Sequence, residues 1–300
     1  MSKSTRIFLV ILGSLAVIAV GFTVLLYAVL RPAGGAETIT SGSGEKIAVV
    51  ELRGDIVSSD EVVRQLKQYR ESRSIKSILL RIDSPGGGVV ASQEIYEEVK
   101  RTRDSGKPVV VSMGSLAASG GYYVACGASR IMANRGTLTG SIGVISEFLQ
   151  LQDALQKLGI EVKTVKSGSL KDAGSSTRKM TEADRQYFQH LMDDVHGQFI
   201  GVVANERHLD VDSVRGLADG RVFTGEQAVR LGLVDTLGTF EDAIRLAADI
   251  AGISGEPAIV KERKRRGFLE SMLGDVTDAA SAVKQELLNR PVLSYRYPGQ

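Results

Sequence analysis

Two residue types that together perform nucleophilic catalysis, a serine and a lysine, each stand in a loop of small residues in this 300-residue chain. Ser119 lies in the run Gly114–Tyr123, with alanines before it and glycines after it. Lys171 lies in a second glycine- and serine-containing loop, residues 166–174. A serine hydroxyl becomes a useful nucleophile only when a neighbouring base takes its proton. The two loops therefore suggest acyl transfer by an activated serine.

Either a histidine or a lysine can serve as that base, and the sequence favours the lysine. The three histidines, His190, His196 and His208, lie in or at the end of one long helical stretch, away from the strand ends where functional loops gather. A lysine near its reference pKa of about 10.4 is protonated, but burial can lower that pKa by roughly 3–5 units. The ordinary alternatives are a solvated loop lysine for Lys171 and a helix N-cap for Ser119. Spacing alone does not decide between these readings.

A third loop, 83–88, contains three consecutive glycines. Its spacing matches neither a P-loop nor a dinucleotide-binding fingerprint, so no nucleotide or other cofactor is expected. An oxyanion hole needs only two converging backbone N–H groups, and Gly86 and Gly120 are the candidates. A tight turn that needs positive φ is the alternative, although it explains one glycine more easily than three.

Strands and helices alternate around these loops. Short apolar runs predict strands at residues 47–52, 75–82, 108–113, 130–133, 142–145 and 162–165. Helical spacing predicts helices at residues 60–73, 89–103, 181–207, 225–231 and 239–251, with one more at 268–288. Strands separated by single helices favour βαβ units, so the expected class is α/β with a mainly parallel sheet.

Composition excludes several kinds of protein. The net charge of +2 gives no reason to expect nucleic-acid binding. The single cysteine, Cys126, rules out an intrachain disulfide. With three histidines far from it in the sequence, Cys126 also leaves no ligand set for a structural zinc ion, so no metal is expected.

The N-terminal region predicts a membrane anchor. Residues 7–30 form an uncharged run of 24 residues, long enough to span a bilayer and longer than the apolar part of a cleavable signal peptide. Lys3 and Arg6 precede the run, which favours a cytoplasmic N-terminus and a single-pass membrane protein whose main domain is extracytoplasmic. The expected organisation is a cytoplasmic N-terminus at 1–6, the anchor at 7–30, a flexible linker at 31–45, the main domain at 46–255 and a basic, partly helical tail at 256–300.

A charge run, KERKRR, opens that tail at residues 261–266. We interpret it as a solvated linker. Contact with anionic lipid or with a partner is the sharper alternative.

Together, the loops resemble the signal peptide peptidase SppA family in its short, single-domain form. The matching motifs follow the family order: Asp83–Gly87, Met113–Tyr123, Thr139–Val144, Ser167–Gly174, Phe223–Gly225 with Ala228, and Leu231–Asp235. The resemblance runs from about Ile47 to about Ala251, which is most of the chain after the anchor. The region after Lys261 lies outside it.

The resemblance implies a ClpP/crotonase-like fold and a serine endopeptidase that degrades cleaved signal peptides or other apolar, membrane-released peptides. By motif position, the family nucleophile falls on Ser119 and its lysine base on Lys171. The oxyanion donors fall on the N–H groups of Gly86 and Gly120, and a serine that orients the lysine falls on Ser141. The family takes its serine and lysine from neighbouring protomers or from two fused halves. This chain is therefore expected to form a ring-like homo-oligomer.

Two other functions remain open at this stage. A crotonase-type enzyme acting on an acyl-CoA would use the same oxyanion geometry, although the predicted anchor and extracytoplasmic location argue against it. A membrane scaffold that keeps the fold without the activity is the third reading. Labelling of Ser119 by a serine-directed covalent probe would separate an enzyme from a scaffold.

Overall fold

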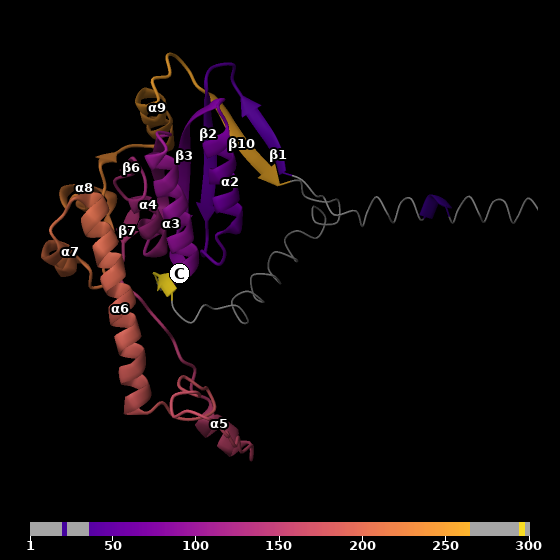
Figure 1. Cartoon of the computed structure of the whole chain (residues 1–300), viewed down its shortest axis with the longest axis vertical. Helices are drawn as coiled ribbons and strands as arrows, with labels where there is room; N and C mark the ends of the chain where they lie inside the picture. Colours follow the sequence, from indigo (N-terminus) through magenta and orange to yellow (C-terminus); the bar gives the residue numbers. More distant parts are fainter. Residues whose placement is uncertain (1–19, 23–35, 265–293, 298–300) are drawn as a thin grey trace, which may run out of the picture. The chain divides into compact units, whose positions relative to one another are not determined.

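The computed structural model of the chain describes residues 20–22, 36–264 and 294–297. The chain divides into two units, and the larger one, residues 40–261 with 290–300, contains the α/β fold (Figure 1). Apart from residues 20–22, the expected anchor at 7–30 lies outside the described residues, as does the helix expected at 268–288. Within the described residues, we find no helix with the length and apolar character needed to cross a membrane.

A mainly parallel sheet forms the centre of the larger unit and confirms the expected α/β class. Its strand order is β1-β10-β2-β3-β5-β6-β9, and the neighbours from β10 to β9 pair in parallel. Strand β7 pairs in parallel with the end of β5, and β8 pairs with β7 in the antiparallel direction. The described strands are β1 (Ala36–Ser41), β2 (Lys46–Arg53), β3 (Ile75–Ser84), β4 (Gly86–Gly88), β5 (Val109–Ala118), β6 (Arg130–Ala133), β7 (Leu138–Gly140), β8 (Val222–Thr224), β9 (Thr236–Leu237), β10 (Ala258–Lys264) and β11 (Ser294–Arg296).

Helices cover both faces of this sheet, which explains why its strands are almost continuously apolar. On one face, Val50, Leu80 and Val111 belong to a core shared with α2, α3 and α4. On the other face, Val49 and Leu79 pack in a second core with α9. The helices are α2 (Asp60–Glu71), α3 (Val89–Asp104), α4 (Gly120–Cys126), α5 (Gln152–Lys157), α6 (Glu182–Arg207), α7 (Val211–Leu217), α8 (Gly225–Arg230) and α9 (Phe240–Ile250).

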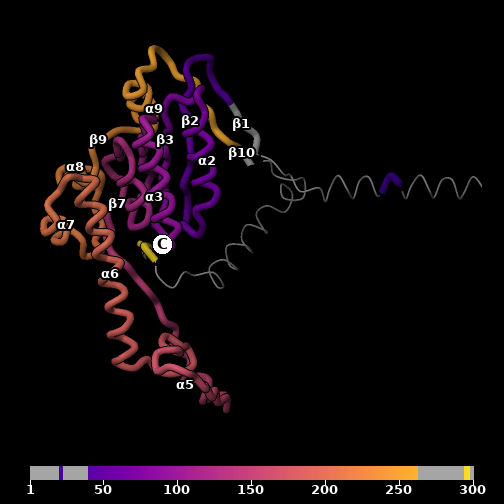
Figure 2. The backbone as a smooth tube through the Cα atoms, in the orientation of Figure 1, coloured from indigo at the N-terminus to yellow at the C-terminus, as the bar shows by residue number. Residues whose placement is uncertain are grey.

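The long helix α6 confirms the helix expected at 181–207. Thr181 caps it, and Asp184 completes a reciprocal capping box with two backbone hydrogen bonds of 2.9 and 3.1 Å. Phe199 and Val203, in its second half, are buried in the core, whereas most side chains before Val195 are exposed. Figure 2 shows the chain leaving β7, passing through α5 and returning to the sheet as α6. The first half of α6 and α5 therefore form an arm, which we define as residues 146–195.

Two of the expected strands are missing or reduced. Residues 162–165 form no strand, and Val162 and Val165 are exposed. β-branched residues favour a strand only where a neighbouring strand can pair with them. The strand expected at 142–145 is reduced to a single bridge at Ile145.

Two stretches expected to lie outside the sheet contain strand residues. The linker expected at 31–45 includes β1 (Ala36–Ser41). The first residues of the charge run at 261–266 belong to β10, which pairs with β2. Lys261 there forms an ion pair of 2.7 Å with Glu51.

Candidate active site

Ser119 is the single residue that joins β5 to α4. The strand ends at Ala118 and the helix begins at Gly120. The φ and ψ angles of Ser119 are 52° and −116°, a left-handed φ that is strained for a residue with a Cβ. Such strain persists only where the surrounding structure fixes it, and it clusters at active sites. The backbone at Ser119 therefore supports the expectation that this residue performs chemistry.

The hydroxyl of Ser119 is buried and unpaired. Only 1% of the residue is exposed, and Oγ has no hydrogen-bond partner among the described residues. The side chain also makes no capping bond to α4, so the ordinary role of an N-cap serine does not explain it. A buried polar group without a partner costs roughly 1–3 kcal/mol. A group kept at that cost points to a function outside folding.

Ser141 occupies the equivalent position on the neighbouring strand. β5 and β7 pair in parallel with Ala118 opposite Gly140, so the two serines follow paired strand ends. Ser119 N–H donates a 2.8 Å hydrogen bond to the Gly140 carbonyl. Ser141 is buried and has a φ of 49°. Among the described residues other than glycine, positive φ occurs only at these two serines and at His208, which ends α6.

The structure brings Gly86 and Gly120 together, as the oxyanion-hole prediction requires. A Cβ built on Gly86 would lie 2.6 Å from the nitrogen of Gly120. Gly86 has a φ of 101°, which a residue with a Cβ rarely adopts. Its own N–H donates to Ser84 Oγ at 3.1 Å. The backbone of β4 therefore approaches the first residue of α4 closely, but the Gly86 N–H would have to leave Ser84 Oγ before it could bind a substrate group.

The closeness of this contact gives a prediction for Gly86→Ala. The new Cβ would clash with the Gly120 backbone and with the Tyr295 carbonyl, 2.0 Å away. Adding the cost of overpacking to that of positive φ, we expect a loss of about 3 kcal/mol in the free energy of unfolding. Gly106→Ala is the matched control, because Gly106 has a φ of 88° but open space around it. This control should lose about 1 kcal/mol of unfolding free energy. If denaturant titrations showed the same loss for both variants, the close contact between Gly86 and Gly120 would be contradicted.

Lys171 lies in an exposed loop on the arm. The next residue, Asp172, receives two hydrogen bonds from Arg178, of 2.9 and 3.0 Å. Arg178 also hydrogen-bonds Asp184, in the first turn of α6. These bonds from Arg178, aided by one from Lys166, lower the pKa of Asp172 to about 2, and Arg178 also lowers the pKa of Asp184. The loop that carries Lys171 is therefore fastened to the start of α6.

One copy of the chain does not bring Lys171 to Ser119. The Lys171 loop is fastened at Asp184, whereas Phe199, further along α6, contacts Tyr123 in α4. Fifteen residues of α-helix separate these two points, a distance of about 22 Å. Ser119 Oγ accordingly has no partner, and the predicted pair is not assembled within a single chain.

Sequence reasoning missed the backbone on either side of the site. Gly87 appeared only as one of three loop glycines, and Ile145 as part of a predicted strand. In the structure both face the segment Ser294–Tyr297, through the pairing of β4 with β11 and the bridge at Ile145. No local signal in the sequence marks that segment, because its partners lie far away along the chain.

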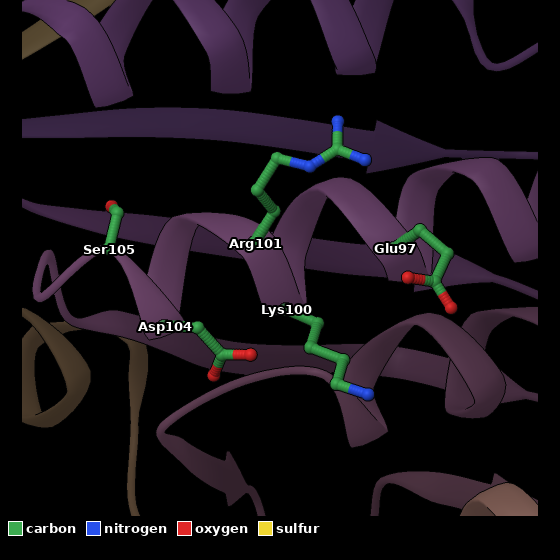
Figure 3. Close-up of a pocket in the computed structure, with 5 residues that line it drawn as sticks. All are labelled: Glu97, Lys100, Arg101, Asp104 and Ser105. Atoms are coloured by element: carbon green, nitrogen blue, oxygen red, sulfur yellow. The ribbon is translucent and has the colours of Figure 1, made fainter.

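A separate surface pocket lies on α3. Its lining residues come from that helix and from the residue that follows it: Glu97, Lys100, Arg101, Asp104 and Ser105 (Figure 3). The lining combines charges of both signs and contains none of the residues singled out in the sequence. The candidate active site is therefore at the carboxyl ends of β5 and β7.

Comparison with known proteins assigns the family. The model of Peptidase family S49 matches residues 101–254. A Synechocystis sp. protein provisionally named as a protease is 48% identical over 70% of this chain and 76% of its own length. An Enterococcus faecium protein provisionally named signal peptide peptidase SppA is 36% identical over 80% of this chain and 74% of its own length. Protease 4 of Salmonella typhi is 34% identical over 89% of this chain and 44% of its own length. The mixed α/β fold with a mainly parallel sheet fits a ClpP-like peptidase, and the chain belongs to Peptidase family S49, the signal peptide peptidase SppA family.

Proposed function

We propose that this protein is a membrane-anchored serine endopeptidase with a Ser–Lys dyad. Ser119 is the nucleophile, and Lys171 of a neighbouring copy is the general base. The backbone N–H groups of Gly86 and Gly120 bind the oxyanion, and Ser141 orients the lysine. The active form is a ring-like homo-oligomer.

One observation carries this proposal: a buried, unpaired hydroxyl on a strained residue beside two converging glycines. Ser119 combines the left-handed φ with an Oγ that lacks a partner. Gly86 and Gly120 approach each other so closely that no side chain fits between them. A buried hydroxyl without a partner destabilises the folded chain. It is, however, free to bind a base and a substrate that come from outside the chain.

In the proposed reaction, the neutral amine of Lys171 takes the proton of Ser119 Oγ as that oxygen attacks the peptide carbonyl carbon. The carbonyl π electrons move to the oxygen, and the N–H groups of Gly86 and Gly120 stabilise that negative charge. The C–N bond then breaks, and the ammonium of Lys171 protonates the leaving amine. Water, deprotonated by the same lysine, hydrolyses the acyl-enzyme and restores Ser119.

The separation of the two residues supports a base supplied by another copy. About 22 Å of helix lie between the Lys171 loop and the Ser119 region. The arm also exposes apolar side chains to a degree that is unusual for a surface without a partner: Leu149, Leu158, Ile160, Val162 and Val165. Docking of this surface on a second copy would bury these side chains. It would also remove water from the lysine, which favours its neutral form.

The proposed location and substrates rest on the sequence and the relatives. The uncharged run at 7–30 is long enough to anchor the chain in the cell membrane, with the catalytic domain outside the cytoplasm. The Enterococcus relative bears the name signal peptide peptidase. We infer that this chain degrades cleaved signal peptides or other peptides released from the membrane.

A serine-directed fluorophosphonate probe tests the nucleophile directly. We expect covalent labelling at Ser119, located by mass spectrometry of the digested protein. Ser115→Ala is the matched control, because Ser115 is an exposed serine in β5, close to Ser119 in the sequence, and this variant should label as the unchanged chain does. Absence of labelling, or labelling at another serine, would favour an inactive scaffold of the same fold.

The fastening of the Lys171 loop gives a prediction for Arg178→Gln. Without the bonds from Arg178 to Asp172 and Asp184, the lysine should lose its fixed position, and peptidase activity should fall roughly 10–100-fold. The melting temperature should change little, because the arm lies outside the sheet core. Arg185→Gln removes an exposed ion pair with Glu182 on the same helix and should change activity less than about two-fold.

The same contacts predict how the loop responds to acid. The folded pKa of Asp172, about 2, lies below its unfolded value of about 3.9. A lowered carboxylate pKa stabilises the fold fully above the unfolded pKa and loses that effect as the pH falls towards the folded one. The loop should therefore keep its protection from hydrogen exchange at pH 5–8 and lose it between about pH 4 and pH 2. Loss of protection already at pH 6 would contradict this ion pair.

A further inference from the structure

The strand that leads to Ser119 contains an irregularity. The register of β3 against β5 shifts after Ile82, and Asp83 alone lies opposite residues 114–116. Over this interval β5 thus has two residues more than β3, and we define residues 114–116 as the bulge. Extra residues of this kind bend a strand, and they are frequent beside active sites, where they change the direction of a side chain.

The bulge is also the place where β5 changes its partner on the other side. Before the bulge β5 pairs with β6, and from the end of the bulge onward it pairs with β7. The regular hydrogen-bond ladder is disrupted at a bulge, so other groups must fix the strand there. A slip of β5 by one residue would turn each of its side chains to the opposite face of the sheet. The position of Ser119 therefore depends on what holds the bulge.

Polar side chains from both neighbouring strand regions hydrogen-bond the β5 backbone at the bulge or next to it. We define these three side chains as the brace: Asp83, Thr137 and Thr139. Asp83 Oδ1 accepts a 3.1 Å hydrogen bond from the Leu116 N–H. The Thr137 hydroxyl donates to the Gly114 carbonyl at 2.7 Å, and the Thr139 hydroxyl donates to the Ala117 carbonyl at 2.6 Å. Both threonines are buried, so these bonds are shielded from water.

Ser119 stands between this braced strand and a helix that is also held in place. Every residue of α4 is buried, and the Tyr122 hydroxyl near its start donates to the Leu233 carbonyl at 2.9 Å. The Ser119 N–H donates to the Gly140 carbonyl, and the Ser119 carbonyl accepts from the Tyr123 N–H, both at 2.8 Å. One residue thus connects two fixed elements, which accounts for its φ of 52°. Such a conformation persists only where the surrounding structure determines it.

We propose that Asp83, Thr137 and Thr139 are positioning residues that hold Ser119 in its strained, reactive conformation. They act through the backbone of β5 and make no bond to the substrate. Asp83 and Thr139 each open a motif of the sequence, and the proposed mechanism gives neither of them a role. The effect on rate rests on the proposed function, because it requires Ser119 to be the nucleophile. A shift of the reacting oxygen by about 1 Å can lower a rate roughly 10²-fold.

Thr139→Val in the full-length protein tests the brace, because valine has nearly the shape of threonine but cannot donate to the Ala117 carbonyl. We expect kcat for a fluorogenic peptide to fall at least about ten-fold, with KM within about two-fold, because the nucleophile moves and the peptide contacts do not. Thr139→Ser keeps the hydroxyl and should keep kcat within about two-fold of the unchanged chain.

Thr102→Val is the matched control for the loss of a buried hydroxyl. The Thr102 hydroxyl donates to the Glu98 carbonyl at 2.8 Å, near the end of α3 that lies away from β4. This variant loses the same kind of bond and should leave kcat unchanged. If kcat per folded protein fell equally in Thr102→Val and Thr139→Val, the loss would be a general effect of destabilisation, and the positioning role would be wrong.

A pair of variants at Asp83 separates its hydrogen bond from its charge. Asp83→Asn keeps an oxygen that can accept the Leu116 N–H, so kcat should stay within about three-fold of the unchanged chain. Asp83→Ala removes that oxygen, and kcat should fall at least about ten-fold. Equal losses in the two variants would assign the effect to the charge and overturn the place of Asp83 in the brace.

Thermal unfolding tests the brace without any turnover. With the brace intact, Ser119→Gly should melt about 2–4 °C above Ser119→Ala, because glycine relieves the strain of positive φ. In a Thr139→Val or an Asp83→Ala background the strand can relax, and this difference should fall below about 1 °C. In the Thr102→Val background it should keep its full size. An equal difference in all four backgrounds would overturn the proposal, and the Asp83→Ala background decides if Thr139→Val fails to fold.

The two kinds of measurement also separate this inference from the proposed function. If the glycine advantage depended on the brace but the unchanged chain hydrolysed no peptide, the peptidase would be contradicted and the brace would stand. If the unchanged chain hydrolysed peptides while neither kcat nor the glycine advantage depended on the brace, the brace would be contradicted and the peptidase would stand.

Discussion

Replacing Ser119 by alanine should abolish peptide hydrolysis while leaving the protein folded and at least as stable as before. The rate should fall by roughly 10⁴-fold or more, because the attacking oxygen is lost and the oxyanion hole alone supports little turnover. Stability should be kept or should rise, because the Oγ that is removed is buried without a partner. Activity on a fluorogenic peptide and thermal unfolding measure the two effects.

Comparing Ser119→Gly with Ser119→Ala tests the effect of the backbone strain on stability. The φ of 52° strains any residue with a Cβ, so glycine should be more stable at this position than alanine by about 1 kcal/mol. Ser115→Ala removes an exposed hydroxyl and should change neither quantity. If Ser119→Ala retained turnover, or destabilised the fold by several kcal/mol, the hydroxyl would be structural and the proposed mechanism would be wrong.

Replacing Lys171 by alanine should reduce hydrolysis to a similar extent, and mixing the two inactive variants should restore it. In a mixed oligomer, a chain with Lys171→Ala supplies Ser119, and its neighbour with Ser119→Ala supplies Lys171. At equal amounts, about a quarter of the sites in a symmetric ring should combine both intact residues. The measurement is peptidase activity after coexpression of the two variants, compared with each variant alone.

This experiment distinguishes an active site formed by two chains from one formed within a single chain. Recovery of activity supports the separation of the Lys171 loop from Ser119 by about 22 Å of helix. Lys163→Met is the matched control, because Lys163 is an exposed lysine on the same arm whose replacement should leave activity unchanged. No recovery in an assembled mixture would mean that serine and lysine act within one chain, through a rearrangement of the arm.

The sequence predicted the central fold well because its signals are local. The apolar run at 47–52 needs burial on both faces, and the sheet provides it through α9 on one side and α2 and α3 on the other. Thr181 and Asp184 lie within one helical turn, so their capping box could be predicted from adjacent residues. The glycines at 86 and 120 mark close approaches that few other residues permit.

Three features could not be predicted from neighbouring residues. The run at 162–165 has the composition of a strand but has no strand beside it, whereas the charged run beginning at Lys261 enters a strand because β2 offers an open edge. The segment at 294–297 reads as an ordinary chain end, and its pairing with β4 joins residues about two hundred positions apart. Strand pairing of this kind depends on the partner edge, and the sequence of the segment does not contain that partner.

By itself, the sequence identified the candidate residues, because the small residues and glycines that mark Ser119 and the nearby backbone lie next to one another along the chain. Only the tertiary structure decided that Ser119 has a strained backbone and an unpaired hydroxyl, that Lys171 stands on an arm away from it, and that the Tyr295 carbonyl lies beside Gly86 and Gly120. The physical reason is the distance along the chain over which each interaction acts. Backbone propensity and capping act within a few residues, whereas burial, strand pairing and the meeting of a nucleophile with its base depend on parts of the chain that only folding and assembly bring together.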